Sequence, residues 1–161
     1  MVAEELITRA PATLGPEALV KEAARLMEDQ GVGSVVIVED GEVVGIVTDR
    51  DIVVGLLAFA EDGYVGLATV GEVMTPSPVC VLADDDVEHC LEKMEAHSIR
   101  RLPIKNEYGQ LIGVVSLDDI MMQLASELGK AGALIGSEVM GKIGGMSRAR
   151  VRWLASTNAR K

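Results

Sequence analysis

Two short segments of the chain pair a hydroxyl side chain with an aspartate three residues later. They read Gly-Ile-Val-Thr48-Asp-Arg-Asp51 and Gly-Val-Val-Ser116-Leu-Asp-Asp119. The apolar pair after each glycine favours a buried strand, and the hydroxyl and acidic residues favour the first turn of a helix. At that junction the two side chains lie close enough to hold two hydroxyls of one small polar ligand. One copy alone would predict only a helix cap, whereas two copies predict a repeated site.

The two segments belong to a repeat that covers most of the chain. Residue n matches residue n+67, and one extra residue in the second hairpin raises the offset to 68. In the first copy, a stretch from Glu5 to Leu14 is predicted to be extended, and helical periodicity follows it and ends at Gly31. An apolar strand at 35–38 is joined by the Asp40-Gly41 hairpin signal to a strand at 42–47, and Thr48 opens a second helix. The predicted order is therefore strand, helix, strand, strand, helix. Matched identities include the pairs Glu5 and Glu72, Thr8 and Thr75, Pro11 and Pro78, Gly41 and Gly109, and Gly45 and Gly113.

This duplication predicts an α/β (α+β) fold made of two similar units. We expect the first unit at residues 4–60, a linker at 61–70 and the second unit at 71–126. Residues 127–161 have no counterpart in the first unit. Glycines weaken a helix there, although apolar residues keep a helical spacing and Ser147 could cap a short basic helix.

Composition and charge restrict the classes of function. Among 161 residues, the segment 1–127 carries 24 acidic against 8 basic residues, and the segment 128–161 carries one acidic against seven basic residues. An acidic body repels nucleic acid, so only the basic tail could bind it. The acidic start, the absence of a long apolar run and two unpaired cysteines predict a cytoplasmic protein without a membrane segment.

The residues described so far resemble paired cystathionine β-synthase (CBS) domains, the arrangement known as a Bateman module. The resemblance rests on the two Gly-apolar-apolar-Thr/Ser-x-x-Asp segments, on Val-Met-Thr-Pro at 73–76 and on Ser-Ile-Arg-Arg-Leu-Pro-Ile at 98–104. It covers about residues 4–126. It implies two β-α-β-β-α units packed sheet to sheet about a pseudo-twofold axis, with ligand clefts between them, and a homodimer.

The resemblance also implies a ligand class and a set of nucleotide-binding residues. The expected effectors are adenosyl compounds, namely AMP, ADP, ATP or S-adenosylmethionine, and no cofactor is required. Aspartates of the motif would accept hydrogen bonds from ribose, the entering strands would contact base or sugar, and arginines would contact phosphate. Carried over by position, the binding residues are Thr13, Thr48, Arg50, Asp51, Cys80, Ile99, Arg100, Arg101, Pro103, Ser116 and Asp119.

The two repeats depart from each other in ways that predict unequal clefts. Gly33 and Ser34 stand where the second repeat has Arg100 and Arg101, and Cys80 replaces the hydroxyl of Thr13. Arg50 could reach a phosphate, whereas its counterpart Asp118 would repel one. The sequence leaves open which aspartate shares a cleft with the arginine pair.

Other interpretations of these residues remain open. Asp51 and Asp119 could be first-turn acids that only stabilise their helices. One of Arg100 and Arg101 could be a solvated surface charge, because consecutive strand residues face opposite ways. A metal site is not predicted, because the spacing of the cysteines and histidines in the second repeat fits no zinc pattern.

The pattern as a whole predicts a non-enzymatic sensor of adenosyl ligands that signals to an unidentified protein partner. One rival function is a nucleic-acid- or ribosome-associated adaptor that acts through the basic tail. An enzyme is the second rival, although no glycine-rich phosphate loop of the Walker kind and no nucleophile with an evident base appear in the sequence. Catalytic residues are therefore not assigned.

Overall fold

The computed structural model describes residues 1–58 and 67–158 of the chain, and no side chain of Leu57 or of residues 138–158. It divides the chain into two compact bodies, Met1–Ile120 and Met121–Lys161. Both copies of the repeat motif lie in the body Met1–Ile120. The linker predicted at 61–70 falls mainly on residues outside the described ranges.

The first sheet has four strands in the order β1-β2-β3-β4. Strands β2 and β3 are antiparallel and are joined by Asp40 and Gly41, which both have positive φ (51° and 85°), as the Asp-Gly signal predicts for a type I′ turn. Helix α1 ends at Gly31, whose φ of 61° is the left-handed conformation that glycine adopts without strain. The elements are β1 (Thr13–Leu14), α1 (Val20–Gln30), β2 (Ser34–Glu39), β3 (Glu42–Thr48), the π-helix η2 (Asp51–Leu57) and, from the second repeat, β4 (Thr75–Pro76).

The second sheet has three strands in the order β5-β6-β7 and repeats the plan of the first. Its first pair is parallel and its second pair antiparallel, as in the first sheet. The longer hairpin is closed by Asn106, whose Oδ1 accepts hydrogen bonds from the amides of Tyr108 and Gln110. The elements are α2 (Val70–Val73), β5 (Val81–Leu82), α3 (Val87–His97), β6 (Arg101–Lys105) and β7 (Leu111–Ser116).

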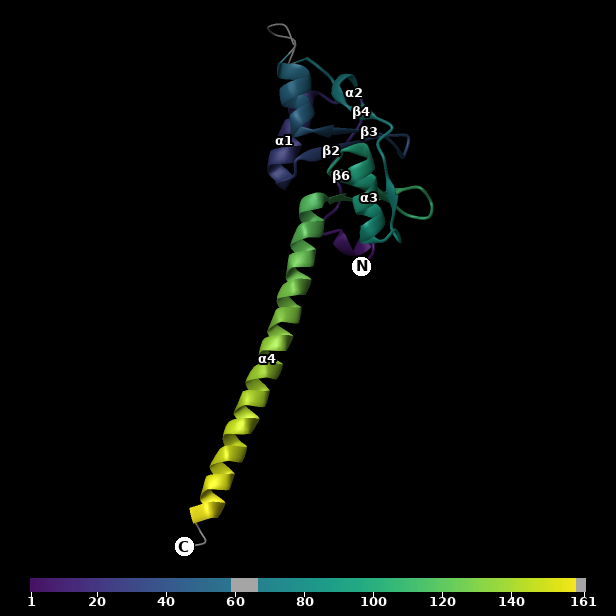
Figure 1. The fold of residues 1–161 in the computed structure, drawn as a ribbon. Coiled ribbons are helices and arrows are strands. Elements are labelled where there is room, and N and C mark those ends of the chain that lie inside the picture. Colours follow the sequence, from purple (N-terminus) through teal and green to yellow (C-terminus); the bar gives the residue numbers. More distant parts are fainter. Residues whose placement is uncertain (59–66, 159–161) are drawn as a thin grey trace. The chain divides into compact units, whose positions relative to one another are not determined.

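The opening segment of each repeat packs on the core of the other repeat. Residues Ala3–Leu6 form the 3-10 helix η1, in which Ala3 and Leu6 are buried in the second core. Short helix α2 places Val70 in the first core, and β4 pairs with β3 (Figure 1). The extended conformation predicted from Glu5 is therefore wrong at its start, because the Glu5 carboxylate closes a helical turn by accepting from the amide of Val2.

Two equivalent glycines allow these crossing segments to pass close to the sheets. A Cβ on Gly113 would lie 2.6 Å from Cγ1 of Ile7, and a Cβ on Gly45 would lie 2.9 Å from Cγ of Met74. Ile7 and Met74 occupy equivalent positions of the repeat. The glycine of each Gly-apolar-apolar motif is thus required by the exchange of segments between the repeats.

Each repeat has its own aliphatic core. The first is built around Val35, Ile37 and Val47, and the second around Leu102, Ile104 and Val115, all with no exposed side-chain area. These residues lie on β2 and β3 of the first sheet and on β6 and β7 of the second. The cores therefore hold the ends of β3 and β7 in place, where the Thr/Ser-x-x-Asp motifs begin.

Helix α4 (Leu117–Asn158) begins at the second motif and continues through the glycine-rich tail as one helix of 42 residues (Figure 1). A separate short helix capped by Ser147 was one expectation, and the structure instead continues the helix through that residue. The apolar residues of α4 keep a helical spacing, although its glycines have a low helix propensity. Among the described residues, no helix is both long and apolar enough to cross a membrane.

Candidate functional site

Each Thr/Ser-x-x-Asp motif closes a reciprocal set of hydrogen bonds at the start of its helix. Oδ2 of Asp51 accepts from the amide of Thr48 at 2.8 Å and from its hydroxyl at 2.7 Å, and the amide of Asp51 donates to Thr48 Oγ1 at 3.2 Å. Ser116 and Asp119 repeat this pattern, with the amide of Ser116 2.9 Å from Oδ2 of Asp119. The capping interpretation is therefore correct for one oxygen of each carboxylate.

The second oxygen of each carboxylate remains available to a ligand. Oδ1 of Asp51 and Oδ1 of Asp119 have no hydrogen-bond partner among the described residues, and each aspartate lines a cleft. A carboxylate oxygen that accepts a hydrogen bond from a hydroxyl group forms a charge-assisted hydrogen bond. Helix capping and ligand binding are thus compatible in the same side chain.

The cleft that contains Asp51 has a volume of about 430 Å³ and combines residues of both repeats. The first repeat supplies the motif, and the second repeat supplies the segment that crosses to β3 and the turn between α3 and β6. This volume lies within the range of about 300–1,000 Å³ typical of small-molecule sites. We name it the Asp51 cleft; its lining residues are Ile46, Thr48, Asp49, Arg50, Asp51, Thr75, Ser77, Pro78, Val79, His97, Ser98, Ile99, Arg100 and Arg101.

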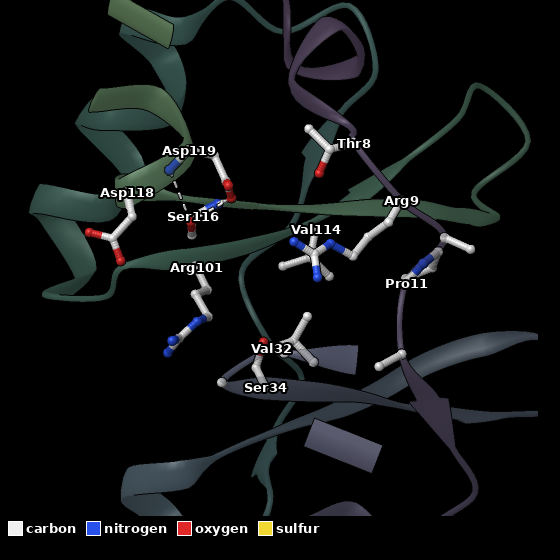
Figure 2. A pocket seen from close by; sticks show the side chains of 14 residues that line it. Thr8, Arg9, Pro11, Val32, Ser34, Arg101, Val114, Ser116, Asp118 and Asp119 are labelled. Atoms are coloured by element: carbon white, nitrogen blue, oxygen red, sulfur yellow. Dashed lines mark hydrogen bonds between the residues drawn. The ribbon is translucent and has the colours of Figure 1, made fainter. Parts of the chain in front are cut away.

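The cleft that contains Asp119 is smaller, at about 240 Å³, and has the reverse composition (Figure 2). The second repeat supplies the motif, and the first repeat supplies residues 8–12 and 31–34, equivalent to the segments that line the other cleft. We name it the Asp119 cleft. Its lining residues are Thr8, Arg9, Ala10, Pro11, Ala12, Gly31, Val32, Gly33, Ser34, Arg101, Val114, Ser116, Asp118 and Asp119.

The two clefts differ in charge. Three arginines and two aspartates line the Asp51 cleft, whereas two arginines and two aspartates line the Asp119 cleft. Of the two arginines in the Asp119 cleft, Arg9 donates from Nη1 to the carbonyl of Gln30 at 2.6 Å, at the carboxyl end of α1. Its guanidinium is thus partly committed to the helix terminus, and the Asp51 cleft has the larger number of arginines available to an anion.

Most residues predicted to bind nucleotide line one of the clefts. Ile99, Arg100 and Arg101 lie in the Asp51 cleft, together with Thr48, Arg50 and Asp51 from the other repeat, while Ser116 and Asp119 lie in the Asp119 cleft. Arg100 and Arg101 both line the cleft, because β6 begins only at Arg101 and strand alternation does not apply to Arg100. Arg100 is nevertheless largely exposed and Arg101 half-buried.

Three predicted residues lie outside both clefts. Thr13 has already entered the first sheet, where it pairs with Val36, and its side chain is exposed. Pro103 is fully buried within β6. The Sγ of Cys80 donates to the carbonyl of Pro78 at 3.3 Å, and burial raises the pKa of the Cys80 thiol.

Several of the lining residues that sequence reasoning missed come earlier in each crossing segment. Residues 8–12 and their equivalents Thr75 and 77–79 line the clefts in the places predicted for Thr13 and Cys80. The repeated Thr-x-x-Pro of Thr8 and Thr75 was the signal that could have identified them. As for metals, no group of three histidine, cysteine or acidic side chains suited to an ion occurs in the described part of the chain.

Comparison with known proteins agrees with this architecture. The family model described as "CBS domain" matches residues 2–58 and 70–126. The CBS domain-containing protein YhcV of Bacillus subtilis is 34% identical over 131 residues, which span 81% of this chain and 91% of YhcV.

Two solved structures share the fold and were determined with adenosyl compounds. CBS domain protein PAE2072 from Pyrobaculum aerophilum, complexed with AMP, has a TM-score of 0.67 at 28% identity over 78% of this chain and 98% of that one. The CBS domain pair of protein MJ0100, in complex with 5′-methylthioadenosine and S-adenosyl-L-methionine, has a TM-score of 0.69 at 25% identity over 79% and 98%. The chain described here therefore belongs to the CBS-domain family and carries two CBS domains in tandem.

Proposed function

We propose that this chain is a non-catalytic regulatory sensor that binds an adenosyl ligand (AMP, ADP, ATP or S-adenosylmethionine) in the clefts between its CBS domains. The observation that carries the proposal is the second carboxylate oxygen of Asp51, which has no partner in the described structure and belongs to a cleft with three arginines. An acceptor for ribose hydroxyls and donors for phosphate thus meet in one site. The AMP complex of PAE2072 and the S-adenosylmethionine complex of MJ0100 support the ligand class.

In the Asp51 cleft, each part of an adenosine nucleotide has suitable partners. Asp51 and Thr48 would hold the ribose hydroxyls, and the side chains of Ile99 and Val79 offer apolar contact for the base. Arg100 and Arg101 would hold the phosphates through their forked donors. The Asp119 cleft would be the weaker site, because it is smaller and has one arginine fewer.

The signal would arise from the sharing of each cleft between the repeats. A ligand that contacts the motif of one repeat and the crossing segment of the other favours the arrangement in which both contacts form. The relative tilt of the two repeats would then differ between the free and bound states. An unidentified protein partner would respond to that difference.

Ligand-dependent stabilisation tests the proposal directly. A ligand at 100 times its dissociation constant should add about 2.7 kcal/mol to the free energy of unfolding. For a chain of this size, that corresponds to an increase of about 5–10 °C in melting temperature. Mass spectrometry of small molecules that co-purify would name the ligand. A melting temperature unchanged by millimolar AMP, ADP, ATP and S-adenosylmethionine would refute the proposal.

We also propose that the chain is a homodimer. The helices that follow the two motifs carry apolar side chains that the described part of the chain leaves uncovered, with 57% of Val53 and 75% of Met122 exposed. Leu56 and Ile120, on the same helices, are instead buried in the cores. An isologous contact between two copies would cover the exposed set.

Two rival functions can be separated from this one by simple assays. An adaptor acting through the basic tail would bind RNA or DNA in a gel-shift assay, and changing Arg148, Arg150 and Arg152 to Gln would abolish the shift. An enzyme would convert a bound nucleotide to product. Intact nucleotide after prolonged incubation with purified protein would favour the sensor.

A further inference from the structure

Arg101 is the one residue shared by the linings of the two clefts. It is the first residue of β6, where it pairs with Ser116 of the second motif. Its equivalent in the first repeat is Ser34, a small buried residue. The pseudo-twofold arrangement therefore contains one guanidinium at this position, where a symmetric pair of repeats would contain two.

The guanidinium of Arg101 lies directly on the backbone of the first repeat. A Cβ built on Gly33 would lie 2.5 Å from its Nη2 and 3.3 Å from its Cζ. A side chain at Gly33 would therefore overlap the guanidinium in the position from which Arg101 lines the Asp119 cleft. Oδ2 of Asp49, which lines the other cleft, lies 3.3 Å from the same Cβ position.

The donors of Arg101 are not used within the described structure. No hydrogen bond or ion pair joins its side chain to another described residue, whereas Arg9 already donates to the carbonyl of Gln30. Of the two arginines in the Asp119 cleft, Arg101 is therefore the one whose donors have no described partner. The Asp51 cleft keeps Arg50 and Arg100 even without it.

We propose that Arg101 is a phosphate ligand shared by the two clefts, and that its single guanidinium serves only one of them at a time. A nucleotide phosphate in the Asp51 cleft would draw Arg101 away from the Asp119 cleft, so that a second nucleotide would bind there more weakly. Ligands without phosphate would bind to the two clefts without this competition. This inference rests on the proposed function and adds to it a negative coupling specific to anionic ligands.

Single-cleft variants of the full-length chain make the coupling measurable. Thr75 lines the Asp51 cleft and its repeat equivalent Thr8 lines the Asp119 cleft, and both are exposed. Thr75→Trp should fill the Asp51 cleft and Thr8→Trp the Asp119 cleft, each leaving one site. Calorimetric titration with ADP and with adenosine then gives the affinity of each cleft alone.

We expect Arg101→Ala to weaken ADP binding about ten-fold in each single-cleft variant, the scale of one charge-assisted hydrogen bond. Adenosine affinity should stay unchanged. In the otherwise wild-type chain, the product of the two ADP dissociation constants should rise only about ten-fold, because Arg101 contributes to one site at a time. Two independent arginine contacts would raise that product about a hundred-fold, and would overturn the proposal.

Two further variants separate position from charge. Gly33→Ala keeps the arginine but should displace it from the Asp119 cleft, so it should weaken ADP in the Thr75→Trp chain and not in the Thr8→Trp chain. Arg25→Ala removes an exposed charge of α1 outside both clefts and should change neither affinity. Loss of ADP affinity in only one of the single-cleft chains on Arg101→Ala would show that the residue is not shared.

Inorganic pyrophosphate separates this inference from the proposed function. If neither adenosine nor ADP binds, the adenosyl-sensor proposal fails. Pyrophosphate should still bind, with the second equivalent per chain weaker than the first, and its affinity should fall about ten-fold in Arg101→Ala. Two equal and independent pyrophosphate sites, or affinity retained without Arg101, would overturn the shared-ligand proposal.

Discussion

Replacing Asp51 separates its helix-capping role from its proposed ribose-binding role. Asp51→Ala removes the acceptor for the amide and the hydroxyl of Thr48. Loss of such a cap costs about 0.5–2 kcal/mol of stability. That cost corresponds to a fall of about 1–8 °C in melting temperature for a chain of this size.

Asp51→Asn is the more selective change. Its amide oxygen can still accept from the Thr48 amide, so stability should fall less than in Asp51→Ala. The ligand-facing group, however, loses its negative charge and becomes a donor. If Oδ1 binds ribose, affinity for AMP should fall about ten-fold or more, because hydrogen bonds to charged groups contribute about 1.5–3 kcal/mol.

Asp86 provides the matched control. Its Oδ1 caps α3 by accepting from the amide of His89 at 2.7 Å, and it lines neither cleft. Asp86→Ala should therefore lower the melting temperature as Asp51→Ala does, with no change in AMP affinity. Calorimetry gives the affinity and stoichiometry, and a thermal melt without ligand gives the stability. AMP binding in Asp51→Asn and Asp51→Ala that equals wild type would reduce Asp51 to a helix cap.

Four further outcomes follow from the structure. Gly113→Ala should lower the free energy of unfolding in urea by about 1–3 kcal/mol, because the new Cβ would overlap Ile7. Adding Ile7→Ala should restore part of that loss. A wild-type urea midpoint for Gly113→Ala would contradict the close approach. Combining Arg100→Ala with Arg101→Ala should weaken ADP more than adenosine and reduce the salt dependence of ADP binding, whereas equal losses would mean that these arginines shape the fold. Light scattering at micromolar concentration should give the mass of a dimer, and a monomer with and without ligand would exclude the proposed dimer. Cys90 is fully buried, and burial raises the pKa of its thiol. Less thiolate is therefore present at pH 8 than in free cysteine, and iodoacetamide should react with Cys90 more slowly. Reaction as fast as that of glutathione would contradict this burial.

Local chemistry was sufficient to predict the first hairpin turn and the end of α1. The two-residue hairpin at Asp40-Gly41 needs positive φ at both positions, and few residues other than Asn, Asp and Gly adopt it readily. The end of α1 at Gly31 follows from the same property. The periodicity of apolar residues and the chemistry of turns act over a few residues, so one copy of the repeat contains all the information that these features require.

The position of the arginine pair could not be obtained in this way. Arg100 and Arg101 share a cleft with Asp51 of the other repeat, because the opening segment of each repeat crosses to the opposite sheet. That exchange is a contact between residues far apart in sequence, and no local pattern expresses it. For the same reason, residues 8–12 line a cleft while Thr13, one position later, has already joined the sheet.

The sequence by itself determined the duplication, the hairpins, the end of α1 and the identity of the Thr/Ser-x-x-Asp motifs, because each depends on side chains close together in the chain. Tertiary structure decided which aspartate faces which arginines, and it placed Arg101 on Gly33 between the two clefts. It also buried Pro103 away from both sites. These outcomes depend on the packing of one repeat against the other, and the free energy of that packing is distributed over two cores rather than contained in any motif.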